Sequence, residues 1–484
     1  MKSNFLTILT GALLVWGCNA PKIVQEAAIK DLPDSFPQYT IGQDSNTVLA
    51  KVPWKQFFPE EELRQLIDTA IANNPDLQMA LQRIKISSAY MQTAKGALLP
   101  TLSADATASG THYGKYTQEG VGNFDTNLSD NIDNNQRINE SFTPNFWLGF
   151  NTSWEMDVWG KLNSRKKEAY SKYLASNEGK NIVQTALVSQ LATLFYTVKG
   201  LDQEYKALRE NIALQDTALE KVKALMEGGR ATQLALQQFQ AQLLNTQTSI
   251  AEVTRRRTET ENQINALVGR FSGSVAMDTI SEAPFSTVNS DSFKLGFPVQ
   301  IIANRPDIRE AGFLLAASKA NVDAAHKAFF PSFTISGYGA FNAFKGALLF
   351  NGSSLAYSVL GGVSAPIFQQ NRLKSEFNIA TAEQQNAFLQ YQKNILNGYQ
   401  EVATSLSNFE AAQKMYGLKT READALEAGV QSANDLYIGG YAGYLEIIAA
   451  QKSLVQAQVE QIQLRRNIML SLVDIYRAVG GGWR

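Results

Sequence analysis

The side chains that most often carry chemistry are scarce in this chain of 484 residues. It holds two histidines, His112 and His326, and a single cysteine, Cys18. A zinc site and a disulfide both need more ligands or thiols than these, so counting excludes both. Neither histidine has a convincing partner nearby, and no nucleophile–base pair or phosphate-binding loop is evident. We therefore expect no enzymatic activity, no cofactor and no metal.

Cys18 is the one residue with a candidate chemical role, as a site of lipid attachment. It follows Lys2 and an apolar run over 5–17, which is typical of an export signal and too short to span a bilayer. Together with the preceding Val-Trp-Gly it resembles a bacterial lipobox, although Trp16 is bulky for that motif. An ordinary signal peptide with an incidental cysteine is the alternative. We expect a signal peptide at 1–17 and a lipid, palmitate included, on Cys18.

The overall charge is nearly balanced, with 44 basic and 45 acidic residues. This balance gives no electrostatic footprint for nucleic acid. No stretch after the signal is apolar enough for a transmembrane helix, so any membrane crossing must use strands.

Long helices dominate the sequence pattern. Residues 162–227 contain no proline, and apolar residues recur there at spacings of three and four, interrupted at Gln215. Such a heptad pattern predicts a left-handed supercoil about 100 Å long. The pattern consists of Leu187, Leu191, Leu194, Val198, Leu201, Tyr205, Leu208, Ile212, Leu219, Val222 and Met226. A glycine pair and a second apolar pattern over 236–267 predict a returning helix, and hence a helical hairpin.

The chain repeats itself. Asn74-Pro75-Asp76 matches Arg305-Pro306-Asp307 at an offset of 231, and from residue 160 onward the offset is 211. The first copy therefore holds 20 extra residues, which fall in 111–141, a stretch rich in Gly, Asn and Asp that we interpret as a solvated loop. A duplication of this size indicates one structural unit used twice.

Each copy contains two segments in which apolar and polar residues alternate. Phe146, Leu148, Phe150 and Trp154 would share one face of a strand, and Phe333, Ile335 and Phe341 of another. Alternation over about ten residues suits strands of a membrane β-barrel, although soluble hairpins are the alternative. Four strands cannot close a barrel, and open edges are not tolerated in lipid. We therefore expect several chains to pool their strands, in a number that the residues alone do not fix.

These patterns predict the following division of the chain. An extended anchor strip covers 18–59, and a first repeat covers 60–270, with a β-hairpin at 101–158 and a helical hairpin at 162–268. A connector at 271–304 would lie beside the strip and the C-terminal end. The second repeat covers 305–479, with a β-hairpin at 332–368 and a helical hairpin at 372–479. A glycine-rich tail, 480–484, ends the chain.

Several short motifs, in order, resemble the TolC superfamily of outer-membrane efflux factors, in its OprM/NodT lipoprotein branch. The resemblance covers essentially the whole mature chain. Its motifs are NNPDL at 73–77, WEMDVWG at 154–160, NRPDIR at 304–309, APIF at 365–368, LYIGG at 436–440, YLEII at 444–448 and YRAVGGGW at 476–483.

This resemblance implies a homotrimer. Each chain would give four strands to a twelve-stranded β-barrel in outer-membrane lipid and helical hairpins to a periplasmic α-barrel. The function would be a passive duct for small molecules, drugs being the first choice and metal efflux or type I protein secretion the alternatives. The partners would be a periplasmic adaptor and an inner-membrane transporter, with resistance-nodulation-division type as the first choice. The location would be the outer membrane of a Gram-negative bacterium.

The resemblance also places the inner constriction near the second hairpin turn, 437–450. Glu446 falls at the family's position for a carboxylate ring, whereas Ala442 and Ala449 replace a gating arginine and a second acidic residue. Three carboxylates around a narrow axis would favour cations. Tyr437, Tyr441 and Tyr444 could narrow the opening instead, and simple packing in the hairpin is the alternative for these tyrosines. Gly228, Gly229, Gly439 and Gly440 are expected to form the turns and, by analogy alone, to contact the adaptor.

Two further interpretations remain. The basic run Arg255-Arg256-Arg257 is expected to be a solvated helix face. A periplasmic coiled-coil scaffold that forms no pore is the main alternative to a duct, but it leaves the alternating strands unexplained.

Overall fold

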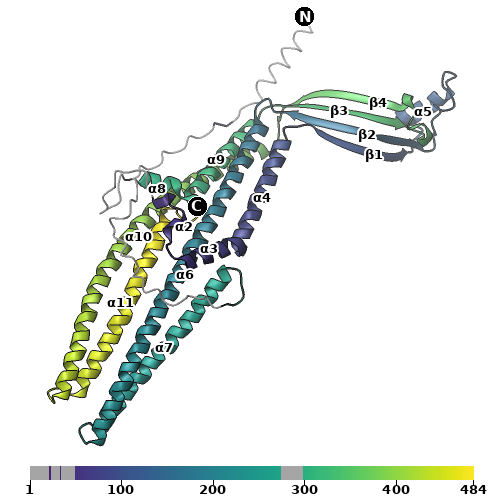
Figure 1. Ribbon diagram of the computed structural model, residues 1–484. Helices are drawn as coiled ribbons and strands as arrows, with labels where there is room; N and C mark the ends of the chain where they lie inside the picture. Colours follow the sequence, from purple (N-terminus) through teal and green to yellow (C-terminus); the bar gives the residue numbers. More distant parts are fainter. Residues whose placement is uncertain (1–20, 23–32, 34–48, 274–297) are drawn as a thin grey trace. The chain divides into compact units, whose positions relative to one another are not determined.

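The computed structural model describes residues 21–22, 33, 49–273 and 298–484 (Figure 1). The chain forms two compact units, and both sequence copies contribute to each. Among the described residues, unit 1 contains 21–22, 86–173 and 314–388, with the four strands, and unit 2 contains 33, 49–85, 174–273, 298–313 and 389–484. Cys18 and the predicted signal peptide lie outside the described residues.

The elements follow the repeat. In the first copy they are η1 (Leu49–Lys51), α2 (Trp54–Phe57), α3 (Glu61–Asn73), α4 (Pro75–Gly96), β1 (Thr101–Thr111), α5 (Gln118–Leu128), β2 (Thr143–Met156), α6 (Lys161–Glu227) and α7 (Gln233–Leu267). In the second they are α8 (Pro298–Asn304), α9 (Pro306–Lys327), β3 (Ser332–Ala343), η3 (Gly346–Leu348), η4 (Gly352–Ser354), β4 (Leu355–Ser364), α10 (Arg372–Ile438) and α11 (Tyr444–Ala478). The predicted helical hairpins are therefore confirmed as α6–α7 and α10–α11.

The sheet has the order β1-β2-β3-β4, with each pair antiparallel. Its register places the predicted apolar residues on one face, since Leu148 pairs with Phe341 and Trp154 pairs with Ile335. The opposite face is mainly polar, with rows such as Ser103–Asn151–Tyr338–Ser358. The alternation in the sequence thus corresponds to a two-faced sheet whose edges are β1 and β4. Among the described helices, none combines the length and the apolarity of a membrane span.

The core of unit 2 gathers segments from both copies and from both ends of the chain. Leu191 and Phe195 of α6, Ile301 of α8 and Tyr476 of α11 are all buried in it, together with Phe58. The Tyr476 hydroxyl donates to the Val52 carbonyl at 2.7 Å. Residues 298–304 belong to the predicted connector: Ile301 is buried in this core, and the Asn304 Oδ1 accepts a hydrogen bond from Arg484 Nη2 at 3.2 Å. Residues 274–297 lie outside the described part of the chain.

Two expectations about irregular segments were wrong. The stretch 111–141 is largely exposed, as expected, but it contains α5, which begins where the Thr117 hydroxyl accepts a hydrogen bond from the Gly120 amide at 3.1 Å. The second segment is the end of the strip, where Trp54 and Phe58 are buried and α2 replaces the extended chain. Local capping and burial thus formed helices where composition indicated loops.

Candidate constriction at the helical hairpin turns

The two hairpin turns have the same backbone geometry, 211 residues apart. In the first, the Arg230 amide donates to the Leu225 carbonyl at 2.8 Å, and in the second the Tyr441 amide donates to the Leu436 carbonyl at 2.8 Å. Gly229 and Gly440 carry φ values of +71° and +79°. This is the Schellman helix ending, in which a left-handed residue lets the chain satisfy its last carbonyls.

Gly229 and Gly440 are therefore the two residues of these turns whose left-handed backbone favours glycine. Gly228 and Gly439 do not have positive φ and precede the left-handed residue in each turn. A Cβ on Gly439 would lie 3.0 Å from the Tyr441 ring, so a larger residue there would require this exposed ring to shift. Their contact with an adaptor stays a prediction.

The returning helices begin in different ways. The Thr232 hydroxyl accepts the Ala235 amide at 3.2 Å and so caps α7. Gly443 occupies the equivalent position before α11 and has no side chain with which to cap it. Glu446 lies in the first turn of α11, and its Oε2 would be 3.0 Å from a Cβ on Gly443. A carboxylate is favourable there because the helix N-terminus is positive.

The three predicted tyrosines do not act alike. Tyr437 and Tyr444 are half-buried and pack on a small core formed by Val222, Leu236, Phe239 and Ile447. Tyr441, in contrast, is 87% exposed at the turn. The first two thus pack the two hairpins against each other, while Tyr441 and the exposed Glu446 are free to face a lumen. Which way they face in an assembly stays a prediction.

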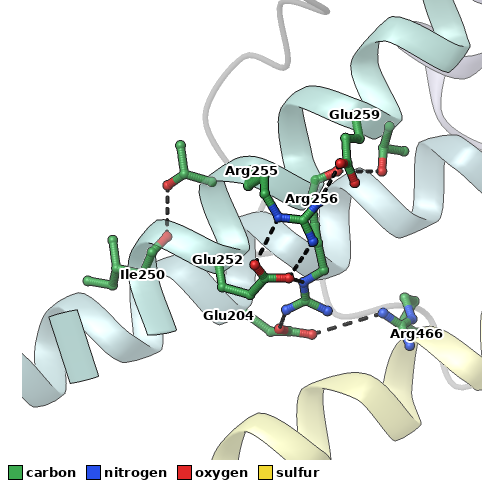
Figure 2. Close-up of polar contacts among 9 residues, drawn as sticks. Glu204, Ile250, Glu252, Arg255, Arg256, Glu259 and Arg466 are labelled. Atoms are coloured by element: carbon green, nitrogen blue, oxygen red, sulfur yellow. Dashed lines mark hydrogen bonds and ion pairs between the residues drawn. The ribbon is translucent and has the colours of Figure 1, made fainter. Parts of the chain in front are cut away.

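A buried carboxylate links the two hairpins farther along the helices (Figure 2). Glu204 of α6 is 1% exposed; its Oε2 lies 2.9 Å from Arg256 Nη2 of α7, and its Oε1 lies 4.0 Å from Arg466 Nη1 of α11. Burial lowers the pKa of Arg466; the Glu204 carboxylate opposes this shift, and the charge of Arg256 adds to it. The network borders a cavity of about 570 Å³ between α6, α7 and α11.

Sequence reasoning missed Glu204 and placed Tyr205 in the apolar pattern instead. The structure leaves Tyr205 40% exposed, and the side chain before it points inward. A signal was available, because Glu204 stands three residues after Leu201 and four before Leu208, both of which are buried. Gln215, the predicted interruption, is also buried, at 4% exposure.

The expectation that Arg255–Arg257 form a solvated face was correct only for Arg255. Arg255 pairs with Glu252 and Glu259 on the surface of α7 (Figure 2). Arg256 reaches Glu204, and Arg257 Nε donates to Asp202 Oδ1 at 2.6 Å. Arg256 and Arg257 face α6, where Glu204 and Asp202 provide acidic partners, whereas Arg255 faces solvent.

His112 and His326 belong to unit 1, whereas the groups described above belong to unit 2. The ring of His112 hydrogen-bonds the Ser141 carbonyl, and that of His326 packs edge-on against Phe330. Within the ranges that the structure describes, no cluster of three or more His, Cys, Asp or Glu side chains is arranged to hold a metal ion.

The fold and the duplicated hairpins agree with comparisons to known proteins. The model of the outer membrane efflux protein family matches residues 66–270 and 297–481, and the chain belongs to this family. It is 28% identical to the solvent efflux pump outer membrane protein SrpC of Pseudomonas putida over 479 residues, 97% of each chain. It is 26% identical to the cation efflux system protein CusC of Escherichia coli K12 over 480 residues, 97% of this chain and 98% of the relative.

Solved structures confirm the architecture. A crystal structure of CusC matches with a TM-score of 0.80 and 26% identity, covering 96% of this chain and all of that one. The outer-membrane channel OprN matches in fold with a TM-score of 0.81 at 21% identity, over 95% of this chain and 99% of that one. The chain is thus an outer-membrane efflux protein of the TolC-like fold, and the predicted protein class, the role in efflux and the outer-membrane location are confirmed.

Proposed function

We propose that three copies of the chain form one passive duct through the outer membrane and periplasm, and that small molecules leave through its lumen. The observation that carries this proposal is the sheet with two unlike faces and two open edges, β1 and β4. Edges are costly in lipid unless they pair, so β1 of one copy is expected to pair with β4 of the next. The non-pore scaffold has no use for such a sheet.

Conductance of the purified protein in planar bilayers tests the duct. Channels, together with disulfide-linked trimers from cysteines placed on β1 and β4, would support it. A monodisperse monomer without conductance would favour the scaffold. Enzymatic activity has no support, since the relatives are named as efflux components.

The exported class is proposed as drug-like small molecules, with metal cations as the second candidate. Matches to proteins named for solvent efflux and for cation efflux support both. Type I protein secretion stays a third alternative. Growth of a deletion strain on a panel of drugs, solvents and copper or silver salts, with and without the gene, distinguishes the first two.

The partners are proposed to be a periplasmic adaptor at the hairpin turns and an inner-membrane transporter of the resistance-nodulation-division type. The glycine turns, exposed in both hairpins, support an adaptor contact by analogy. The lumen constriction is proposed at Glu446 and Tyr441, with Tyr437 and Tyr444 holding the turn. Crosslinking from a photoreactive residue at Tyr441, in cells that carry the neighbouring pump genes, would identify the adaptor or show that none binds there.

Cys18 is proposed as the lipid anchor. A relative named as a probable outer membrane lipoprotein, SilC of Salmonella typhimurium, supports this reading. Mass spectrometry of the mature N-terminus checks it: acyl chains on Cys18 should appear in the wild type and be absent in Cys18→Ser.

A further inference from the structure

The polar face of the sheet carries one carboxylate without a basic partner. The four strands contain no Lys, Arg or His and only two acidic residues, Asp105 in β1 and Glu155 near the end of β2. Glu155 Oε1 lies 2.6 Å from Lys161 Nζ and is compensated. Asp105 forms no ion pair with any residue in the part of the chain that the structure describes. It is therefore the one uncompensated charge of the four strands.

Neutral donors hold this carboxylate in place. Asp105 Oδ2 accepts hydrogen bonds from Asn151 Nδ2 at 2.7 Å and from Ser103 Oγ at 3.2 Å. Asp105 is also the one residue of β1 that is half-buried, all others being exposed. An amide and a hydroxyl fix the position of a carboxylate but leave its negative charge intact.

The row of the sheet that contains Asp105 is otherwise small. Its partners across the strands are Gly149, Ala340 and Ala356. The rows on either side hold Trp147 and Tyr338, whose rings lie edge to face with centroids 6.5 Å apart. All of these residues share the polar face, because residues paired across strands lie on the same face and so do residues two positions apart within one strand.

We propose that Asp105 makes the strand section of the duct selective for cations, and that Trp147 and Tyr338 extend this selectivity to organic cations. The inference rests on the proposed trimer, in which three copies of Asp105 form one ring around the lumen. Rings of carboxylates favour cations in pores, and the faces of Trp and Tyr attract cations as well. The small Gly149 and Ala340 let the two rings approach each other across this row, which brings them close to the carboxylate.

A cysteine reporter tests the local potential without depending on the state of any constriction. Thr107→Cys places a thiol on the same face of β1, two residues from Asp105. Its modification by a cationic (trimethylammonium-ethyl) and an anionic (sulfonato-ethyl) methanethiosulfonate is followed by mass spectrometry at that residue, in purified trimers. We expect Asp105→Asn, which keeps the hydrogen-bond acceptor, to lower the cationic-to-anionic rate ratio at least about fivefold. Glu155→Gln, at the compensated carboxylate, is the matched control and should leave the ratio nearly unchanged.

Two outcomes would overturn the proposal, and they are distinguishable. If the reporter reacts readily but Asp105→Asn leaves the ratio unchanged, the duct stands and the role of Asp105 is wrong. If Thr107→Cys reacts no faster than Ala106→Cys on the apolar face, the strands do not line an aqueous lumen, and the duct fails with it. For the aromatic pair, Trp147→Leu should slow the trimethylammonium reagent, and an unchanged rate would remove Trp147 and Tyr338 from the proposal.

Discussion

Arg305 occupies in the second copy the position that Asn74 holds in the first, and both side chains donate to the last turn of a returning helix. Asn74 Nδ2 lies 3.0 Å from the Leu267 carbonyl, and Arg305 Nη1 lies 2.7 Å from the Ala478 carbonyl. The two acceptors are themselves 211 residues apart. The contact has thus been kept while the side chain that makes it has changed.

Replacing Asn74 by alanine should destabilise the helical unit. Asn74 also caps α4, since its Oδ1 accepts the Leu77 amide at 3.1 Å, and loss of such a cap costs about 1 kcal/mol. The thermal midpoint of the circular dichroism signal should fall. Asn73→Ala is the matched control, because the Asn73 amide only donates to the Thr69 carbonyl on the surface. Equal midpoints for the two variants would contradict the role of Asn74.

Glu204→Ala should be much more damaging than Glu252→Ala. The first leaves Arg256 and Arg466 without their buried carboxylate, a type of loss that costs about 3 kcal/mol when one partner of a buried pair is removed. Glu252 is an exposed residue of the same network. Chemical denaturation of the purified protein measures both, and Glu204→Gln shows how much of the effect is charge. A Glu204→Ala variant as stable as Glu252→Ala would contradict the link between the hairpins.

Gly440, the left-handed glycine that follows α10, gives a prediction whose control, Gly429, lies inside α10. Gly440→Ala should cost about 1–2 kcal/mol, because an L-residue resists a φ of +79°. Gly429→Ala, at an exposed position inside α10 with open space around it, should instead stabilise the helix by about 0.5–1 kcal/mol. Thermal midpoints of the two variants should therefore move in opposite directions, and a shared direction would argue against the turn geometry.

Glu310 gives a prediction about pH. Burial raises its pKa in the folded protein, and the nearby carboxylates of Asp307 and Glu178 raise it further. The unfolded chain then ionises first as pH rises, so Glu310 reduces stability above its unfolded pKa of about 4.3. Glu310→Gln should raise the thermal midpoint at pH 7, and the gain should vanish as pH falls toward 4. A gain that is independent of pH would point to packing instead.

Glu446→Ala should leave trimers intact and reduce cation selectivity at the inner end of the duct. Glu446 is exposed in the first turn of α11, so its loss has little effect on packing. The reversal potential under a salt gradient in planar bilayers measures the selectivity. Unchanged selectivity in a correctly assembled variant would remove Glu446 from the constriction.

The regular elements were predictable because their hydrophobic periods are long, and a single break such as Gln215 does not hide the period. The helix expected at 162–227 matches α6 to within one residue, and α10 begins at residue 372, where the second hairpin was expected to begin. Phe150 and Trp154 lie on the expected face of β2. These features depend on local sequence alone. The short helix α5 was missed because it depends on the Thr117 cap rather than on an apolar pattern.

The candidate site was predictable only where the backbone determines it. The need for glycine at 229 and 440 follows from the chain reversal. The spacing of Glu204 to buried neighbours in α6 indicated its inward placement, but its partners Arg256 and Arg466 are distant in sequence. No local pattern reveals partners supplied by another helix.

The shared ending of α6 and α10 has a consequence for genetics. A protein that binds the backbone around Gly229 would find nearly the same backbone geometry around Gly440 of the same chain. A substitution in one turn then leaves the other turn intact as a docking site. Screens that test one substitution at a time will therefore underestimate the functional contribution of these positions. Paired substitutions in both reversals are needed to expose their contribution.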